Sequence, residues 1–265
     1  ELAVSGEFLI AGAPVDEGGS GTAVLYPIDL TSEALVMTSP AADDDFGSSV
    51  EISYGFGDRN PGYQLAWVTA PGDAAEAGRV YGYSYDGVSW SATDTVAGST
   101  AGDRLGHAVH ASGRTLFLSI PGDGANGALR QSGWSDNGFT TLLGAWRPST
   151  LLDGDVVANG DVFAAGALDV DEVQVVTRNG TTAADVAQPL GTSTGTSGRS
   201  LDLDGNWLIS ATDAASADWT QLADLVELSS IGTVFDAPAN KVTPEFGSDY
   251  SRFGAIVDAT IDTWA

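Results

Sequence analysis

The sequence of 265 residues contains no cysteine, a single lysine (Lys241) and only two histidines. The absence of cysteine excludes disulfide bonds, thiol nucleophiles and thiolate metal sites. Because histidine is so scarce, general acid-base chemistry would fall mainly to carboxylates. The apolar runs are also far shorter than the about 20 residues that a membrane-spanning helix requires.

Basic residues are scarce as well. Ten Lys and Arg residues stand against 36 Asp and Glu residues, which gives a formal net charge of -26. Such a field repels a phosphate backbone and an anionic membrane surface, so we expect neither nucleic acid partners nor direct membrane insertion. Hydrophobic residues make up 43% of the chain, which is enough to bury a core. The sequence therefore predicts a folded acidic protein whose self-repulsion is screened in saline water.

Strong helix formers are few, whereas 34 glycines accompany abundant Ser, Thr and Asp, a composition typical of short strands joined by tight turns. A strand, tight turn and second strand recur along the chain, with the second strand ending 44 to 57 residues after its predecessor. A period of this size with four strands per unit is typical of β-propeller blades. The copies of this pattern lie at residues 2–14, 50–71, 109–121, 156–168 and 200–212.

A second marker, ending in glycine, precedes the first strand of most units. Its copies are Phe46-Gly47, Leu105-Gly106, Ser197-Gly198 and Phe253-Gly254, with a looser Leu152-Asp153-Gly154. We predict that the Phe fills the gap between blades and that its Gly adopts a turn conformation closed to other residues. Third strands are expected at residues 22–28, 79–85 and 172–177, and fourth strands at 34–38 and 139–143.

These patterns predict an all-β fold, a single β-propeller domain over residues 1–265 built of four-stranded antiparallel blades. The chain holds five complete repeats plus a partial sixth, and the domain is expected to be incomplete at both ends. We favour part of a six- or seven-bladed ring over a five-bladed ring with an extra hairpin. An open sheet edge invites pairing with another segment, which ring closure prevents.

The pairing of Phe46-Gly47 with Ala11-Gly12-Ala13-Pro14 resembles the FG-GAP repeat of integrin-type and bacterial surface β-propellers. This resemblance implies an extracellular or cell-surface protein with an adhesive or structural role. Members of that family that bind calcium carry an acidic loop between the first and second strands. Here the corresponding turns are short, as in Ser5-Gly6-Glu7, so the calcium role does not carry over.

An aspartate follows the second strand of every unit. Turn chemistry, in which the carboxylate accepts hydrogen bonds from nearby backbone amides, is the favoured interpretation. The alternative is calcium binding, although Ca²⁺ takes about six to eight oxygen ligands. We expect no other cofactor. The aspartates, which are the candidate metal ligands, are Asp16, Asp73, Asp123, Asp169 and Asp213.

Two short motifs match enzyme signatures without their structural context. The segment 122–127 satisfies GxGxxG, but a strand is expected after it rather than the helix that receives a pyrophosphate. The segment 191–195 satisfies GxSxG, but a further strand rather than a helix follows, so Ser193 is interpreted as a loop serine. On a strand, the odd separation of His107 and His110 places them on opposite faces and excludes a shared metal.

Other candidates remain open between packing and binding. The pairs Asp153 with Asp155 and Asp202 with Asp204 each share a strand face and could contribute oxygen ligands. Alternating tyrosines at positions 81, 83 and 85 favour packing between blades, with sugar stacking as the alternative. Asn179 begins the one N-glycosylation sequon, on a predicted turn.

We predict a non-catalytic structural or adhesive module, not an enzyme, that binds a protein or glycan ligand at a surface or assembles with other chains. The first alternative is a lectin-like propeller with one sugar pocket per blade. The second is a hydrolase or lyase that uses paired carboxylates in the central funnel, disfavoured because no complete catalytic constellation is visible.

Overall fold

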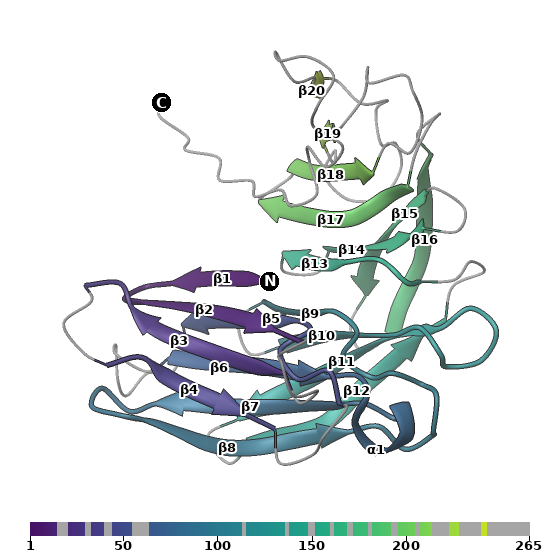
Figure 1. The fold of residues 1–265 in the computed structure, drawn as a ribbon. Coiled ribbons are helices and arrows are strands. Elements are labelled where there is room, and N and C mark those ends of the chain that lie inside the picture. The colour runs from purple at the N-terminus through teal and green to yellow at the C-terminus, as the bar shows by residue number, and fades with distance from the viewer. Residues whose placement is uncertain are drawn as a thin grey trace. The chain divides into compact units, whose positions relative to one another are not determined.

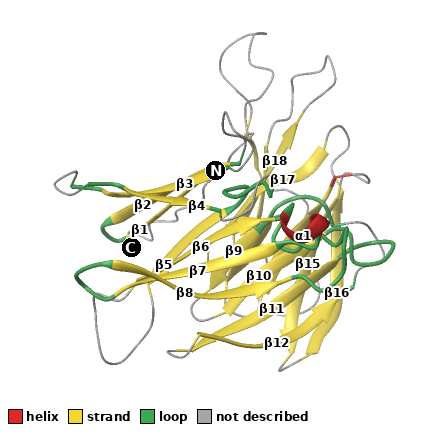
Figure 2. Cartoon of the chain, turned by 60° about the horizontal axis from the view of Figure 1, so that its bottom comes forward, coloured by secondary structure: helices red, strands yellow, loops and turns green. Residues whose placement is uncertain are grey.

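The computed structural model describes residues 1–14, 21–29, 33–39, 44–54, 64–112, 115–135, 138–147, 152–159, 162–168, 172–179, 182–191, 196–204, 207–213, 223–227 and 240–242. Within them the chain forms five four-stranded antiparallel sheets (Figures 1 and 2). This confirms the predicted all-β, propeller-like architecture of four-stranded blades. Contacts divide the chain into two compact units, residues 1–147 and residues 148–265. A single domain over residues 1–265 stays a prediction.

The N-terminal unit contains three sheets, and in each of them strands that follow one another in sequence are paired. This meander is the expected result of strands joined by short turns. The first sheet comprises β1 (Leu2–Ser5), β2 (Phe8–Ala13), β3 (Thr22–Pro27) and β4 (Leu35–Thr38). The second comprises β5 (Val50–Tyr54), β6 (Gln64–Ala70), β7 (Arg79–Tyr85) and β8 (Trp90–Ala97). The third comprises β9 (Val109–Ser112), β10 (Thr115–Ile120), β11 (Ala128–Ser135) and β12 (Gly138–Trp146).

The C-terminal unit repeats this arrangement in two sheets. The first comprises β13 (Val156–Asn159), β14 (Val162–Ala167), β15 (Glu172–Asn179) and β16 (Thr182–Gly191). The second comprises β17 (Thr196–Asp204), β18 (Trp207–Asp213), β19 (Ala223–Glu227) and β20 (Asn240–Val242). The partial sixth repeat predicted from Phe253 onward lies outside the described residues.

The second sheet of the N-terminal unit is covered on both faces, as a propeller blade must be. Its strand β6 is buried along its whole length, which explains a continuous apolar run instead of an alternating one. On one face Val68 packs in a cluster with Phe8 and Ile10 of the first sheet. On the other face Trp67 packs in a cluster with Leu116 of the third sheet.

The Phe-Gly marker fills the joint between the first two sheets, as predicted. Phe46 is completely buried, and its ring centroid lies 5.3 Å from that of Tyr81 in an edge-to-face arrangement. Gly47 has φ of +90°, a conformation that side chains rarely adopt. A Cβ atom at Gly12 would collide with the carbonyl oxygen of Gly47, so the two backbones approach as closely as glycine permits.

The marker glycine makes the same hydrogen bond in three repeats. Its N–H donates to a carbonyl near the end of the second strand of its own sheet, which fixes where the first strand begins. The bonds are Gly47 to Thr69 (2.8 Å), Gly106 to Ser119 (2.9 Å) and Gly154 to Gly166 (3.1 Å).

The loop between β6 and β7 differs from the simple turn expected there. Its helical turn α1 (Asp73–Glu76) contains three consecutive residues with positive φ, namely Ala74, Ala75 and Glu76. The carbonyls of Ala75 and Glu76 accept hydrogen bonds from the N–H groups of Gly102 and Arg104. Left-handed backbone is unfavourable for these residues, so the bonds to the next loop hold it in place.

The glycine-rich segment 122–127 leads directly into the strand β11, which confirms that it opens no helix. In the GxSxG segment, Gly191 ends β16, whereas Ser193 lies outside the described residues. In the part of the chain that the structure describes, no helix has the length and apolar character needed to cross a membrane.

Candidate active site

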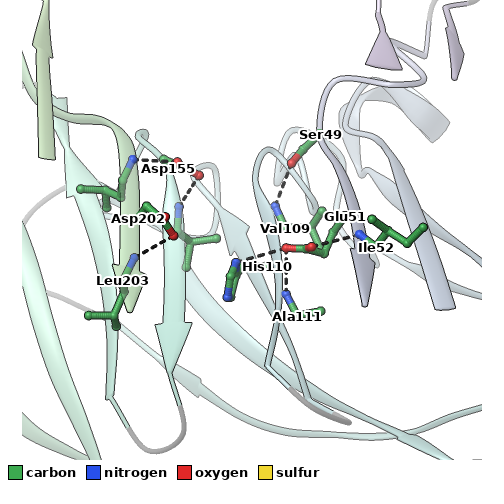
Figure 3. Close-up of polar contacts among 11 residues, drawn as sticks. Ser49, Glu51, Ile52, Val109, His110, Ala111, Asp155, Asp202 and Leu203 are labelled. Carbon is green, nitrogen blue, oxygen red and sulfur yellow. Dashed lines mark hydrogen bonds and ion pairs between the residues drawn. The ribbon is translucent and has the colours of Figure 1, made fainter. Parts of the chain in front are cut away.

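The first strands of two neighbouring sheets bring a glutamate and a histidine together. Strands β5 and β9 each form an edge of their own sheet, and they lie side by side. Glu51 on β5 and His110 on β9 point toward one another, with Oε2 of Glu51 3.1 Å from Nδ1 of His110 (Figure 3). Their side chains are 16% and 23% exposed, so the pair is sheltered and still reachable by solvent.

Backbone amides hold the carboxylate of Glu51 in place. The N–H of Ile52 donates to Oε1 at 2.9 Å, and the N–H of Ala111 on the facing strand donates to Oε2 at 3.3 Å (Figure 3). Hydrogen bonds to a charged acceptor are stronger than those between neutral groups. The carboxylate is therefore oriented before any ligand arrives, as a preorganised site requires.

An apolar side chain borders the pair. Trp67 on β6 is the direct cross-strand partner of Glu51, so both side chains lie on the same face of the sheet. Trp67 is only 1% exposed, and its Nε1 has no hydrogen-bond partner. The neighbouring indole lowers the local dielectric, which strengthens the interaction between Glu51 and His110.

The residue just before the first strand of one sheet accepts a hydrogen bond from the backbone of the first strand of the next sheet. In the N-terminal unit, the Val109 N–H donates to Oγ of Ser49 at 3.1 Å. In the C-terminal unit, the Leu201 N–H donates to Oδ2 of Asp155 at 2.9 Å (Figure 3). Ser49 and Asp155 each directly precede the first residue of their strand, so the two contacts are repeat-related.

The contact of His110 with Glu51 defines what the imidazole can do. When Nδ1 donates its proton to the carboxylate, the lone pair of the neutral ring lies on Nε2. That nitrogen can accept a proton from water, while the carboxylate stabilises the imidazolium that forms. The arrangement suits general base catalysis of hydrolysis.

The predicted metal ligands are differently engaged or lie outside the described residues. Asp73 forms an ion pair with Nε of Arg79 at 2.6 Å and accepts the Tyr81 hydroxyl at 3.2 Å. These partners are side chains rather than the backbone amides expected for a turn residue. Asp16 and Asp169 lie outside the described residues, and Asp213 is described only as the end of β18.

Asp123 also pairs with arginine. Its carboxylate lies 3.1 Å from Nη2 of Arg130 and 2.9 Å from Nη2 of Arg147. Among the residues that the structure describes, no three His, Asp or Glu side chains gather as a metal site would require. Calcium binding stays a prediction. The sequon residue Asn179 ends β15, and the two residues that follow it lie outside the described residues.

From the sequence, His110 was considered only as a metal ligand and Glu51 was overlooked. His107 lies in the turn before β9 rather than on the strand, where its N–H donates to the Arg104 carbonyl at 3.2 Å. A usable signal was present. Glu51, His110 and Asp202 stand at the same place in their repeats, five residues after the first residue of the marker, and all three can ionise.

Aromatic residues of β7 and β8 serve packing between sheets, as favoured by the sequence. The Phe8 ring of the first sheet contacts Tyr85 and Trp90 edge-on, with centroid distances of 4.8 and 5.2 Å. Tyr81, Tyr83 and Tyr85 all pack against the same buried cluster. Sugar stacking on these rings stays an alternative prediction.

No family model and no curated protein matches the chain, so the resemblance to FG-GAP repeats stays a prediction. Solved structures do share its fold. The periplasmic gluconolactonase of Pseudomonas aeruginosa matches with a TM-score of 0.59 and 14% identity, over 91% of this chain and 69% of that chain. A provisionally named 6-phosphogluconolactonase of Bacteroides fragilis NCTC 9343 matches with a TM-score of 0.56 and 11% identity, over 90% and 67% of the two chains.

A third structure, a provisionally named 6-phosphogluconolactonase of Bacteroides uniformis ATCC 8492, gives a TM-score of 0.55 and 11% identity. The match covers 83% of this chain and 63% of that one, so the chain spans about two thirds of the length of these proteins. At such low identity the likeness establishes the fold.

These matches overturn the predicted role. The sequence pointed to a non-catalytic structural or adhesive module, whereas the similar structures carry the names of lactonases, which are hydrolytic enzymes. The prediction that the protein is not an enzyme is wrong on the same ground. The error has a physical reason: repeats define a scaffold, and one scaffold supports both adhesion and catalysis.

Proposed function

We propose that this protein is a hydrolase that opens the ring of a sugar-acid lactone, with His110 as general base and Glu51 as the residue that orients it. The observation that carries the proposal is the contact between Glu51 and His110 on adjacent inner strands. The lactonase names of proteins with the same fold support this reaction class. Of the alternatives raised by the sequence, hydrolysis in the funnel fits best, although with a histidine in place of a second carboxylate.

The reaction follows from the geometry of the pair. Nε2 of His110 takes a proton from a water molecule as the water oxygen attacks the lactone carbonyl carbon. Glu51 keeps the imidazole in the required tautomer and stabilises its positive charge. The acyl bond to the ring oxygen then breaks, and that oxygen receives the proton from the imidazolium. The product is an open-chain hydroxy acid.

The test is lactone opening measured above the uncatalysed rate, with δ-gluconolactone as substrate and acid release as the signal. We expect His110→Gln to lower kcat by about 10²- to 10⁴-fold, the usual contribution of a general base. Glu51→Gln should lower kcat by about 10²-fold or more, since it removes the charge that balances the imidazolium.

The second histidine supplies a matched control. His107→Gln removes an imidazole three residues away, outside the strand, and should leave kcat unchanged. Circular dichroism and melting curves establish that each variant is folded. Equal activity of His110→Gln and wild type, or no lactone opening by folded wild type, would refute the proposal.

We further propose a setting for this activity. The five sheets are consecutive blades of a propeller ring of six or seven blades, in keeping with the repeat spacing and the similar structures. A location outside the cytoplasm is supported by the resemblance to surface propellers and by the periplasmic protein among the fold relatives. Fractionation of the native host, followed by immunodetection, tests the location.

A further inference from the structure

Three of the arginines that the structure describes in the N-terminal unit are paired with carboxylates. Arg79 is paired with Asp73, and Arg130 and Arg147 share Asp123. A fourth, Arg104, has a buried Nε without a hydrogen-bond partner. These four are the arginines whose side chains the structure describes, and only Arg104 among them is not paired with a carboxylate. The described arginines therefore offer no set of convergent, unpaired donors, which a phosphate group requires.

The whole chain adds a repulsive field. A formal charge of -26 on 265 residues produces a negative potential that extends over about 10 Å at 0.1 M salt and about 30 Å at 0.01 M salt. Glu51 contributes a carboxylate within the candidate site itself. A phosphate monoester would carry between one and two further negative charges into this field.

We propose that the Glu51–His110 site acts on uncharged lactones and that the negative field discriminates against phosphorylated ones. This inference rests on the proposed function and names its substrate class. An uncharged lactone enters without an electrostatic barrier, whereas its 6-phosphate is repelled during the approach. The same field favours release of the product, which is an anion.

The stoichiometry makes the product an anion. Addition of water and cleavage of the acyl bond convert the neutral lactone into a hydroxy acid, whose carboxyl group ionises at neutral pH and releases one proton to solvent. The carboxylate product is then repelled by Glu51 and by the chain as a whole. We therefore expect weak product inhibition in addition to selectivity for a neutral substrate.

The experiment compares δ-gluconolactone with 6-phosphogluconolactone at about 10 mM and about 500 mM NaCl, on either side of physiological screening. At low salt we expect kcat/KM to be about ten-fold or more higher for the neutral lactone, since steering changes association rates by such factors. The ratio should fall toward unity at high salt. Inhibition by gluconate should be weak at low salt and stronger at high salt.

A charge-reversal variant separates the field from other effects. Glu7 and Glu33 are exposed and lie outside the candidate site, Glu7 in the turn between β1 and β2 and Glu33 just before β4. Glu7→Lys with Glu33→Lys changes the formal charge from -26 to -22 and should raise kcat/KM for the phosphorylated lactone only. Glu7→Gln with Glu33→Gln changes the formal charge by half as much and should raise this kcat/KM by a smaller factor.

The outcomes distinguish the proposed substrate preference from the proposed lactonase activity. Equal or preferred hydrolysis of the 6-phosphate at low salt would overturn the inference while leaving the lactonase proposal intact. Failure of the folded protein to open either lactone would overturn the proposed function itself. A preference for the neutral lactone that does not change with salt would also overturn the field as its cause.

Discussion

Tyr83 shows how a single residue couples packing to ionisation. It lies on β7 opposite Ala66, against the buried cluster between the first two sheets. Burial raises the pKa of Tyr83 to about 12, and the neighbouring Tyr81 adds to the shift. The cause is that the ionised phenolate would lose its hydration inside the joint.

Stability at high pH should therefore depend on this side chain. In the unfolded chain Tyr83 has the ordinary tyrosine pKa of 10.0, whereas in the folded protein its pKa of about 12 keeps it protonated up to about that pH. Its contribution to stability is fully present below pH 10 and is lost as the pH rises toward 12. We expect Tyr83→Phe to flatten the decline of the free energy of unfolding between pH 10 and 12, measured by urea denaturation.

The control for Tyr83→Phe is the range from pH 7 to 9, where the difference in stability between the two proteins should be constant. Curves that also stay parallel from pH 10 to 12 would contradict the assigned burial of the phenol.

At the scale of residues, the sequence predicted structural roles better than chemical ones. Phe46 and Gly47 were assigned correctly, because a buried aromatic followed by a left-handed glycine follows from local sterics alone. The contact of Glu51 with His110 was missed, since it joins residues in different repeats. Such a contact depends on how adjacent strands pack, which periodicity within one strand does not specify.

The joints between sheets are the critical elements of the fold. At the joint between the first and second sheets, the backbone of Gly12 on β2 lies against the carbonyl of Gly47. No side chain fits between them, so the spacing of the two sheets is set by backbone contact.

Gly12→Ala should destabilise the protein by about 3 kcal/mol, the upper range for overpacking, because the added methyl group meets backbone rather than a flexible side chain. Gly124→Ala is the control. Gly124 has φ of +74° but open space around it, so alanine there should cost only about 1 kcal/mol of conformational strain. Thermal or urea denaturation measures the loss of stability in both variants. An equal loss would show that the first and second sheets can move apart to accommodate the added methyl group.

At the scale of elements, the strand predictions were accurate where apolar runs and turn residues coincide. The third strand predicted at 79–85 is observed as β7 with the same bounds. The left-handed turn α1 was not foreseen, because its three unfavourable residues are held by hydrogen bonds from the following loop.

The whole molecule is dominated by its acidity. With 36 acidic and ten basic residues, self-repulsion opposes the compact state at every pH above the titration of the carboxylates. Counterions screen this repulsion over shorter distances as salt rises.

We expect the melting temperature to rise between about 10 mM and about 500 mM NaCl, concentrations on either side of physiological screening. The Glu7→Lys, Glu33→Lys variant carries less net charge and should show a smaller rise. Calorimetry at matched protein concentration measures both. A melting temperature that is the same or lower at high salt would refute the role of self-repulsion.

The capping of inner strands by Ser49 and Asp155 has a consequence for how such a chain grows. Each cap belongs to one repeat and satisfies the amide of the next, at Val109 and at Leu201. A duplicated repeat thus carries its own hydrogen-bond acceptor for the next sheet, provided that a short polar residue stands directly before its first strand. Gene duplication can then add one repeat at a time without leaving a backbone amide unpaired where the new sheet meets its neighbour.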